Sequence, residues 1–461
     1  MAAHTPPLAP RALRSFAPAL MVLATGAFAG ALVIVSRPAV ALVFPTTAAV
    51  IALALLVRWL AGAYDDAPAA RRVMVWTLGA FAVHLAVGLA IFASPRLTGY
   101  FGGDATTYNL GAIGILQHWR GAGPMPVLPA GKNGFYYMLA GVYWLFGTQP
   151  AAGMAIDAAL AAAMIPLLYD ATRRLFGPAA AGSIPPIVTL LPGFLLWGSQ
   201  LLREAGVYFL TAVCIACAVR LRQRTAVAPI VTLAVAAALL VTWRADVGLI
   251  VAGGLVVGMA LGRGRGAGGF VSGAGAAALV LAFVVGGGLG YSGYHFVTHA
   301  SLGQLNGIRA NSSQSAASGY LANANIATPT HAASYLPLGW TYFTIGPFPW
   351  QIHGGRQLYG LPDSFAWWFL LPSLWRGLRS MWRTDGLGAA LLVLPAVALS
   401  AVLSLLIANF GTTVRERMQV IVVLAPLLAL GWSLRRKRQR PGREIAAGAS
   451  RAMPDRGARH R

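Results

Sequence analysis

The strongest constraint on this chain is a series of apolar runs, each long enough to cross a lipid bilayer. A membrane-spanning helix needs about 20 mostly apolar residues, and backbone polar groups in lipid must be paired within helices or closed barrels. Charged residues make up only 10% of the sequence and lie mainly at the ends of these runs. Soluble domains carry roughly 25% charged residues. We therefore predict an all-α, polytopic membrane protein.

Twelve membrane spans are predicted. Their ranges are 17–36, 39–57, 74–94, 151–170, 180–199, 205–221, 227–243, 247–262, 270–290, 364–379, 387–408 and 418–434. The stretch "GFYYMLAGVYWLFG", 134–147, is too short and too aromatic for a span, and it predicts an interfacial helix on the membrane surface. The spans form one bundle over 1–434, with two large outer segments, 95–150 and 291–363. A basic tail, 435–461, is predicted to be disordered.

Basic residues indicate the orientation of this bundle. The formal net charge is +23, and cytoplasmic loops of membrane proteins are enriched in Lys and Arg. If the N-terminus is cytoplasmic, twelve crossings place "TRRLFG", "RLRQR" and the tail "RRKRQRPGR" on the cytoplasmic side. Because the charges follow the ends of the apolar runs, we attribute them to topology and not to nucleic acid binding. The sequence thus predicts a multi-pass plasma-membrane protein with both termini in the cytoplasm.

Acidic residues are scarce, and five of the twelve fall at the predicted outer face. Asp104 follows "YFGG" at the start of the first outer segment, where glycines let the backbone approach a ligand closely. A carboxylate that is partly desolvated there suits a general base, because burial would raise its pKa. The alternative is a simple helix cap, since "DATTY" would open a helix well. The other four outer acids are Glu204, Asp246, Asp363 and Glu416.

Three predicted outer junctions, "LLREAG", "TWRADVG" and "TTVRERMQ", each combine arginine with an acid. If the helix ends meet, their arginines would form a pocket for an anionic group such as a phosphate, oriented by the acids. The alternative is a set of independent surface pairs that contribute little to stability. The residues concerned are Arg203, Glu204, Arg244, Asp246, Arg415, Glu416 and Arg417.

Further candidates come from the two outer segments. Lys132 is the only lysine outside the tail. Its long, flexible side chain could contact a phosphate or sugar; the alternative is that it is an ordinary solvated lysine of a loop. We expect four tryptophans to lie at the depth of the lipid headgroups, where this residue is enriched: Trp340, Trp350, Trp367 and Trp368. Aromatic faces also stack on sugars and cover prenyl chains, which predicts a groove for an acceptor or lipid. Its candidate residues are Tyr108, Tyr136, Tyr137, Trp350, His353 and Arg356.

Three further features of the sequence bear on possible chemistry. Asp157 lies within a predicted span, where an acid is a functional candidate or pairs with an arginine of another helix. The histidines of the second outer segment have no metal-ligand spacing, so no metal ligands are predicted. Cys214 and Cys217 have CxxC spacing inside an apolar run, which favours ordinary buried helix residues.

Several stretches together resemble the membrane glycosyltransferases of GT-C type that use polyprenyl-phosphate sugars. These relatives include protein mannosyltransferases and the aminoarabinose and lipopolysaccharide-core sugar transferases. The stretches are the outer acid after an early span, "GFYYMLAGVYWLFG", "LYDATRRLFG", "LLPGFLLWGSQLLREAGVYFL" and "VRERMQVIVVLAPLLALG". The resemblance implies a GT-C-like fold and transfer of a sugar to a glycan, lipid or protein acceptor on the extracytoplasmic side. It implies Asp104 as the base and Arg or Lys near the donor phosphate.

One departure from that family and two other readings stay open. Many relatives carry two consecutive acids in the first outer segment, whereas Asp104 is followed by Ala105, which leaves use of a divalent metal open. An O-antigen ligase or polysaccharide polymerase would instead depend on Arg309, His353 and Arg356 and on a diphosphate-linked donor. A transporter or flippase would perform no chemistry, but large ordered outer segments are unnecessary for alternating access.

Overall fold

The computed structural model describes residues 37–61, 64, 66–101, 103–129, 131–262, 273, 275–281, 301–314, 318–352, 358 and 360–451. Within these ranges the chain forms helices and no strand, apart from an isolated bridge between Gly319 and Asn409. The first helices are α2 (Arg37–Ala61), α3 (Ala67–Ala93), α4 (Pro95–Phe101), α5 (Gly103–Trp119), α6 (Asn133–Phe146), α7 (Pro150–Phe176), α8 (Pro178–Ala181), α9 (Ile184–Leu190) and α10 (Pro192–Trp197). They are followed by α11 (Glu204–Gln223), α12 (Val227–Trp243), α13 (Ala245–Gly262), α16 (Leu302–Gln314), α17 (Pro329–Ile345), a short 3-10 helix (Pro349–Gln351), α19 (Leu361–Leu406) and α20 (Phe410–Arg451).

Six helices in the described part of the chain are long and apolar enough to cross a membrane. They cover Ala41–Leu60, Ala67–Ala93, Pro150–Phe176, Glu204–Gln223, Leu361–Leu406 and Phe410–Arg436. The apolar helices α12 and α13 are shorter. Large apolar side chains such as Phe44, Leu55, Val75 and Phe92 are exposed on the outside of the bundle, as expected for a surface in contact with lipid. These features fit a multi-pass, all-α membrane protein.

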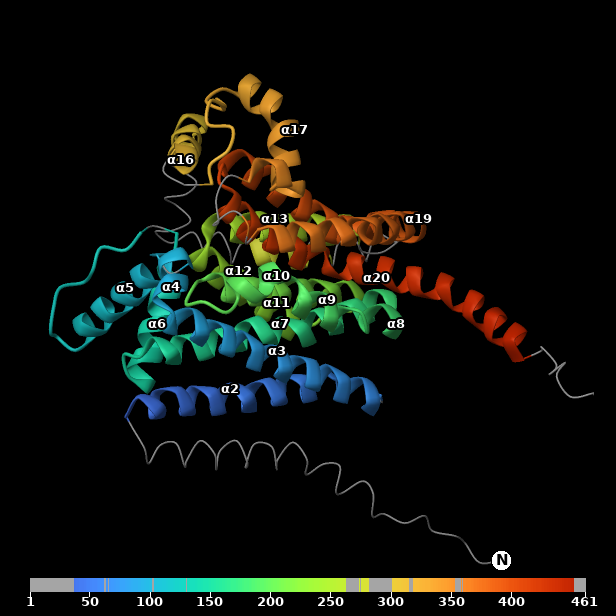
Figure 1. Ribbon diagram of the computed structural model, residues 1–461, viewed down its shortest axis with the longest axis horizontal. Helices are drawn as coiled ribbons and strands as arrows, with labels where there is room; N and C mark the ends of the chain where they lie inside the picture. Colours follow the sequence, from blue (N-terminus) through green and yellow to red (C-terminus); the bar gives the residue numbers. More distant parts are fainter. Residues whose placement is uncertain are drawn as a thin grey trace, which may run out of the picture.

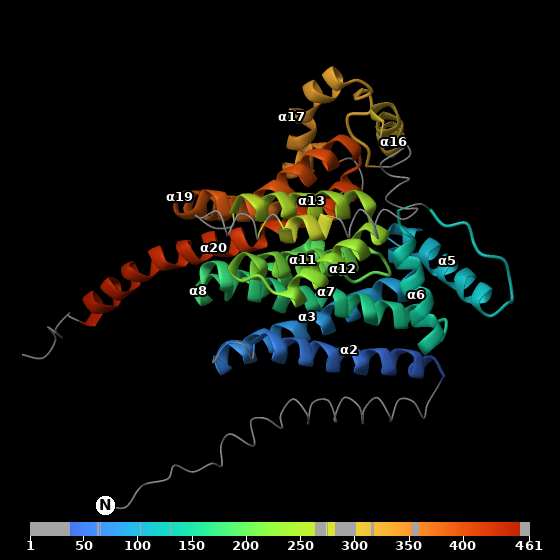
Figure 2. The ribbon, with the colours of Figure 1, turned by 180° about the vertical axis from the view of Figure 1, so that it is seen from behind.

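The long helices lie side by side, with α7, α11 and α20 in the middle and α2 and α3 at one flank (Figures 1 and 2). The helices α5 and α6 lie at one end of the bundle, while α16 and α17 project beside α19. Two groups of charged residues mark the opposite ends. We name them the Asp104 end, which holds Asp104, Arg203, Arg244 and Arg415, and the Asp170 end, which holds Asp66, Asp170, Arg220, Arg222 and Asp385.

One of the predicted spans has a different local structure. The range 180–199, predicted as one span, is divided into parts of α8, α9 and α10, because Pro185, Pro186 and Pro192 cannot continue a helical hydrogen-bond ladder. The predicted spans 364–379 and 387–408 both lie in α19, and this helix breaks at Asp385, a residue with non-helical φ and ψ between the two predicted ranges. The predicted span 17–36 and most of 270–290 lie outside the described residues.

Small residues let the helices at the centre approach closely. A side chain at Gly377 of α19 would collide with the Leu427 carbonyl of α20, and one at Gly431 of α20 with the Ser373 carbonyl of α19. Close backbone contact of this kind is typical of helix packing in membranes. It fixes α19 against α20, the helix that carries Arg415 and runs as a helix to Arg451, past the start of the predicted tail.

Candidate functional site

Four helix termini converge at the Asp104 end. Arg203 precedes α11, and Arg244 lies in the junction between α12 and α13. A side chain at Gly206 of α11 would collide with the ring of Trp243, the last residue of α12. That ring also contacts Phe135 of α6 edge-on, at 5.5 Å between ring centroids. Packing around one tryptophan therefore brings the starts of α6 and α11 to the end of α12.

Arg415 connects the segment 95–150 to these helix ends. One of its terminal guanidinium nitrogens lies 2.7 Å from a carboxylate oxygen of Asp104, which is in the first turn of α5. Its Nε lies 3.3 Å from Glu204 and 3.6 Å from Glu416. Asp104 therefore bonds to an arginine 311 residues later in the chain and does not act only as a helix cap.

Arg244 makes the second group of contacts. Its Nε lies 3.3 Å from Asp246, and a terminal nitrogen contacts Glu416 and lies 4.0 Å from Glu204. The side chains of Glu204 and Glu416 are 1% exposed, so these acids lie beneath the arginines and not in solvent. The three junctions thus form one cluster, and not independent surface pairs. The charge cluster, as we call it below, comprises Asp104, Lys132, Arg203, Glu204, Arg244, Asp246, Arg415 and Glu416.

Two cations of the charge cluster are poorly paired. Lys132, at the start of α6, interacts electrostatically with Asp104, Arg203, Arg244 and Arg415, but it has no hydrogen bond or ion pair with any described residue. Arg203 has a single acidic neighbour, Glu204, at 3.7 Å, and its buried Nε has no hydrogen-bond partner in the described part of the chain. The positive charge of these two side chains is therefore only weakly compensated within the described part of the chain.

The pKa of Asp104 shifts in the direction opposite to the one expected from the sequence. Partial burial favours the neutral carboxyl, but Arg415 outweighs this effect and holds the pKa of Asp104 below its usual value. The expected rise in its pKa is therefore absent in this arrangement. Burial, assisted by repulsion from Arg203, lowers the pKa of Lys132 to about 8. With the bond to Arg415 in place, the Asp104 carboxylate is a weaker base than a free aspartate.

Arg417 points away from the charge cluster, although it was grouped with Arg415 in the sequence. It donates to the Gly346 carbonyl at 2.6 Å and to Asp363 at 2.7 Å, and both members of this ion pair are 1% exposed. Asp363 in turn accepts a hydrogen bond from the Gly193 backbone N–H. Arg417 thus ties α20 to α10, α17 and α19 and supports the fold.

The predicted groove residues do not form one group. The buried Tyr108 packs between Phe135 and Tyr136, and electrostatic interactions with Asp104 and Arg203 link both tyrosines to the charge cluster. Tyr137 is exposed and stacks on Trp119 instead. Trp350 is 73% exposed and stacks on Phe348 in the segment after α17. His353 and Arg356 lie outside the described residues.

A resident metal ion does not fit this donor set. No group of three or more His, Cys, Asp or Glu side chains suited to a metal ion occurs in the described ranges. The acids of the charge cluster are directed at arginines instead. Asp157 is fully buried in α7, interacts electrostatically with Glu204, and pairs with no arginine in the part of the chain described. Cys214 and Cys217 are buried, unbridged residues of α11, as predicted.

Three residues that complete the site were missed from the sequence. The Tyr208 hydroxyl donates to the Arg415 carbonyl, Gln419 donates to Glu416 at 2.6 Å, and the Trp197 ring lies 5.8 Å from the Arg415 guanidinium. Gln419 follows Glu416 by three positions, a helical spacing that would have indicated it. The other two come from distant helices, and no local pattern in the sequence indicates them.

Comparison with protein-family models gives no match to this chain, and no curated protein matches it either. The resemblance to GT-C-type glycosyltransferases therefore stays a prediction from the sequence stretches quoted above.

Proposed function

We propose that this protein is a membrane glycosyltransferase that moves a sugar from a polyprenyl-phosphate carrier to an acceptor hydroxyl at the Asp104 end. The observation that supports this proposal most directly is the ion pair between Asp104 and Arg415. It lies among three further cations, Arg203, Arg244 and Lys132, at the ends of apolar helices. A lipid-linked phosphate enters such a site from the bilayer with its chain between or beside the helices, while its charge meets the cations.

The chemistry required is the stabilisation of a leaving phosphate. When the bond between the sugar C1 and the phosphate oxygen breaks, its electron pair stays on the phosphate and adds negative charge there. Cations held in fixed positions where that charge develops stabilise it strongly. Lys132 and Arg203, which lack strong ionic partners among the described residues, supply this charge and hold the phosphate.

Arg415 couples donor binding to the base. A phosphate bound beside Arg203 competes with Asp104 for the Arg415 guanidinium. As the ion pair loosens, the remaining effect of burial raises the pKa of Asp104 from its depressed value. Asp104 then accepts the proton of the acceptor hydroxyl, whose oxygen forms the new bond to the sugar C1 as the phosphate leaves with inversion. The base is thus weak until the donor is bound.

The topology is part of the proposal. We propose twelve spans, with α19 crossing twice around its break at Asp385, both termini cytoplasmic and the charge cluster extracytoplasmic at the plasma membrane. In support of this, Asp363 contacts Arg417 near the Asp104 end, whereas Asp385 contacts Arg222 at the opposite end of the bundle.

The ligase alternative has less support. Arg309, one of its required residues, is 1% exposed, donates to the carbonyls of Ile407 and Leu321, and lies over the Tyr335 ring. An arginine in these contacts holds the segment after α16 in place and is not available to a diphosphate.

The proposal is tested with the purified full-length protein in lipid nanodiscs and a panel of radiolabelled polyprenyl-phosphate sugars. Release of sugar, to water or to added glycan and lipid acceptors, is measured for the parent, Asp104→Asn and Lys132→Met. Arg120→Met is the matched control, because Arg120 is an exposed cation of the same outer segment outside the charge cluster. We expect Asp104→Asn to lose turnover by about 100-fold or more, the range of general-base catalysis, while still binding donor.

Lys132→Met is expected to weaken donor binding and Arg120→Met to leave it unchanged. Equal turnover by the parent and Asp104→Asn would remove Asp104 from the mechanism. Equal loss in Lys132→Met and Arg120→Met would show that the charge cluster is not the phosphate site.

A further inference from the structure

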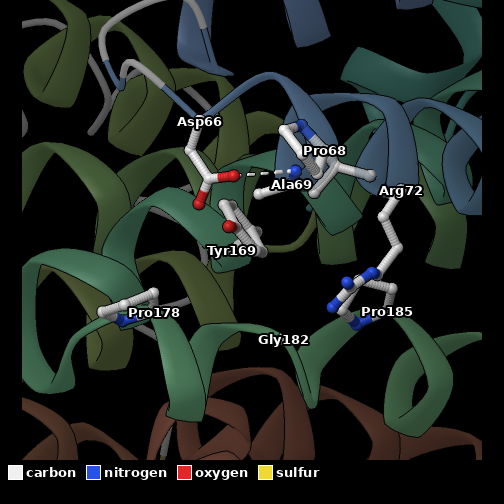
Figure 3. Close-up of a pocket in the computed structure, with 9 residues that line it drawn as sticks. Asp66, Pro68, Ala69, Arg72, Tyr169, Pro178, Gly182 and Pro185 are labelled. Atoms are coloured by element: carbon white, nitrogen blue, oxygen red, sulfur yellow. Dashed lines mark hydrogen bonds between the residues drawn. The ribbon is translucent and has the colours of Figure 1, made fainter.

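A small pocket lies at the Asp170 end, opposite to the charge cluster and unrelated to the proposed reaction. It encloses about 120 Å³ between the start of α3, the end of α7 and the turn from α8 to α9 (Figure 3). Ala69 and Arg72 line it from α3 and Tyr169 from α7, while Pro178 and Pro185 give it an apolar wall. It is therefore amphipathic, with one cation beside apolar surface.

The depth of this pocket is fixed by the membrane-spanning helices. The candidate span Ala67–Ala93 begins at the pocket, and the span Pro150–Phe176 ends there. Trp59, near the end of the neighbouring span α2, is 65% exposed and lies 5.1 Å from the Arg220 guanidinium. Tryptophan is enriched at the boundary between lipid and water. The pocket thus lies at the level of lipid headgroups.

The charges of the pocket leave one cation uncompensated. Asp66 accepts a hydrogen bond from the Ala69 backbone N–H at 3.0 Å and forms an ion pair with Arg173 at 3.3 Å. Arg173 also donates to the Tyr169 hydroxyl. Arg72, on the other side of the pocket in Figure 3, has no hydrogen bond or ion pair with a described residue. The acid is neutralised within the protein, and Arg72 is not.

We infer that this pocket binds the phosphate of an anionic phospholipid from the surrounding bilayer. A guanidinium matches phosphate geometry with paired N–H donors. The prolines provide contact for the glycerol and upper acyl region, which a soluble phosphate cannot use. Exposed Arg71 adds positive charge at this end, and so does the pair Arg174 and Arg220, which share the single carboxylate of Asp170. This charge favours an anionic over a zwitterionic lipid. Bound lipid would join α3 to α7 and α8, as a non-covalent link.

The test uses the full-length protein in detergent, titrated with phosphatidylglycerol, phosphatidylcholine or glycerol phosphate, and reads lipid binding by native mass spectrometry and the thermal unfolding midpoint. Two variants perturb the site by different means. Arg72→Gln removes the cation, and Ala69→Leu fills the pocket without changing charge. Arg71→Gln is the matched control, because Arg71 and Arg72 are both exposed arginines at the start of α3, but only Arg72 lines the pocket.

We expect phosphatidylglycerol to bind and raise the unfolding midpoint, with affinity about ten-fold lower in Arg72→Gln and Ala69→Leu and less than two-fold lower in Arg71→Gln. Equal losses in Arg71→Gln and Arg72→Gln would overturn the inference, because they would indicate general surface attraction. Equal binding of phosphatidylcholine would overturn the anionic preference, and equal stabilisation by glycerol phosphate would overturn the lipid assignment. Sugar transfer at the other end is not needed for any of these readings.

Discussion

Arg415 and Arg417 of α20 each hold an aspartate at 2.7 Å, yet removing the two aspartates should have very different effects on stability. Residues two apart on a helix point to opposite sides. Arg415 faces Asp104, whose side chain is 58% exposed, while Arg417 and Asp363 are both 1% exposed. Exposed ion pairs contribute about 0–1 kcal/mol. Removing one partner of a buried pair costs about 3–5 kcal/mol, because it leaves a buried charge without compensation.

We therefore expect Asp363→Asn to lower the free energy of unfolding by about 3–5 kcal/mol, and Asp104→Asn by about 1 kcal/mol or less. The measurement is an SDS titration of the purified protein in mixed micelles, with α-helix content as the signal. The double variant Asp363→Leu/Arg417→Met should recover part of the loss, because it removes both charges together. Equal destabilisation by the two single variants, or less than about 1 kcal/mol for Asp363→Asn, would refute the assignment of Arg417 to the fold and Arg415 to the site.

Three further predictions address the site, its packing and its orientation. Because the pKa of Lys132 is about 8, its ammonium loses charge as the pH rises past that value, so donor affinity should fall about ten-fold by pH 9. In binding titrations, the affinity of Lys132→Arg for the donor should stay constant over this pH range. A steep fall in that variant would contradict the role of the Lys132 charge. Gly206→Ala should lower the free energy of unfolding by about 1–3 kcal/mol in the same SDS titration, because the added methyl group collides with an indole ring. Gly141 has open space around it, so Gly141→Ala should leave that free energy unchanged or raise it. In intact cells a membrane-impermeant thiol reagent should label the variant Val127→Cys, because Val127 is a fully exposed loop residue. The same reagent should label Arg224→Cys only after the membrane is permeabilised. The reverse pattern would place the charge cluster in the cytoplasm.

Composition and the lengths of the apolar runs were sufficient to predict an all-α membrane bundle, because a span is a local property of about 20 residues. The three charged junctions were also visible, and the structure brings them together with Asp104. Local pattern failed where helix ends depend on special residues. The apolar run 180–199 appears continuous by hydropathy, but its prolines divide it. The break at Asp385 within α19, by contrast, falls between the two predicted spans 364–379 and 387–408.

The roles within the site could not be separated by sequence alone. Arg415 and Arg417 have the same chemistry and nearly the same position, and only the packing of α17 and α19 against one side of α20 distinguishes them. The depressed pKa of Asp104 has the same origin, since its cause is an arginine from the far end of the chain. Reasoning from burial predicted the opposite direction, because the counter-ion was unknown.

The contact between Asp104 and Arg415 also bears on how the protein is made. Asp104 leaves the ribosome 311 residues before its partner, and α20 is the last described helix to be synthesised. Through most of translation, then, the early loop lacks the guanidinium that it bonds in the finished protein. Assembly of the charge cluster has to wait for membrane insertion of that final helix, and a nascent chain stalled before it would expose the Asp104 carboxylate without its counter-ion.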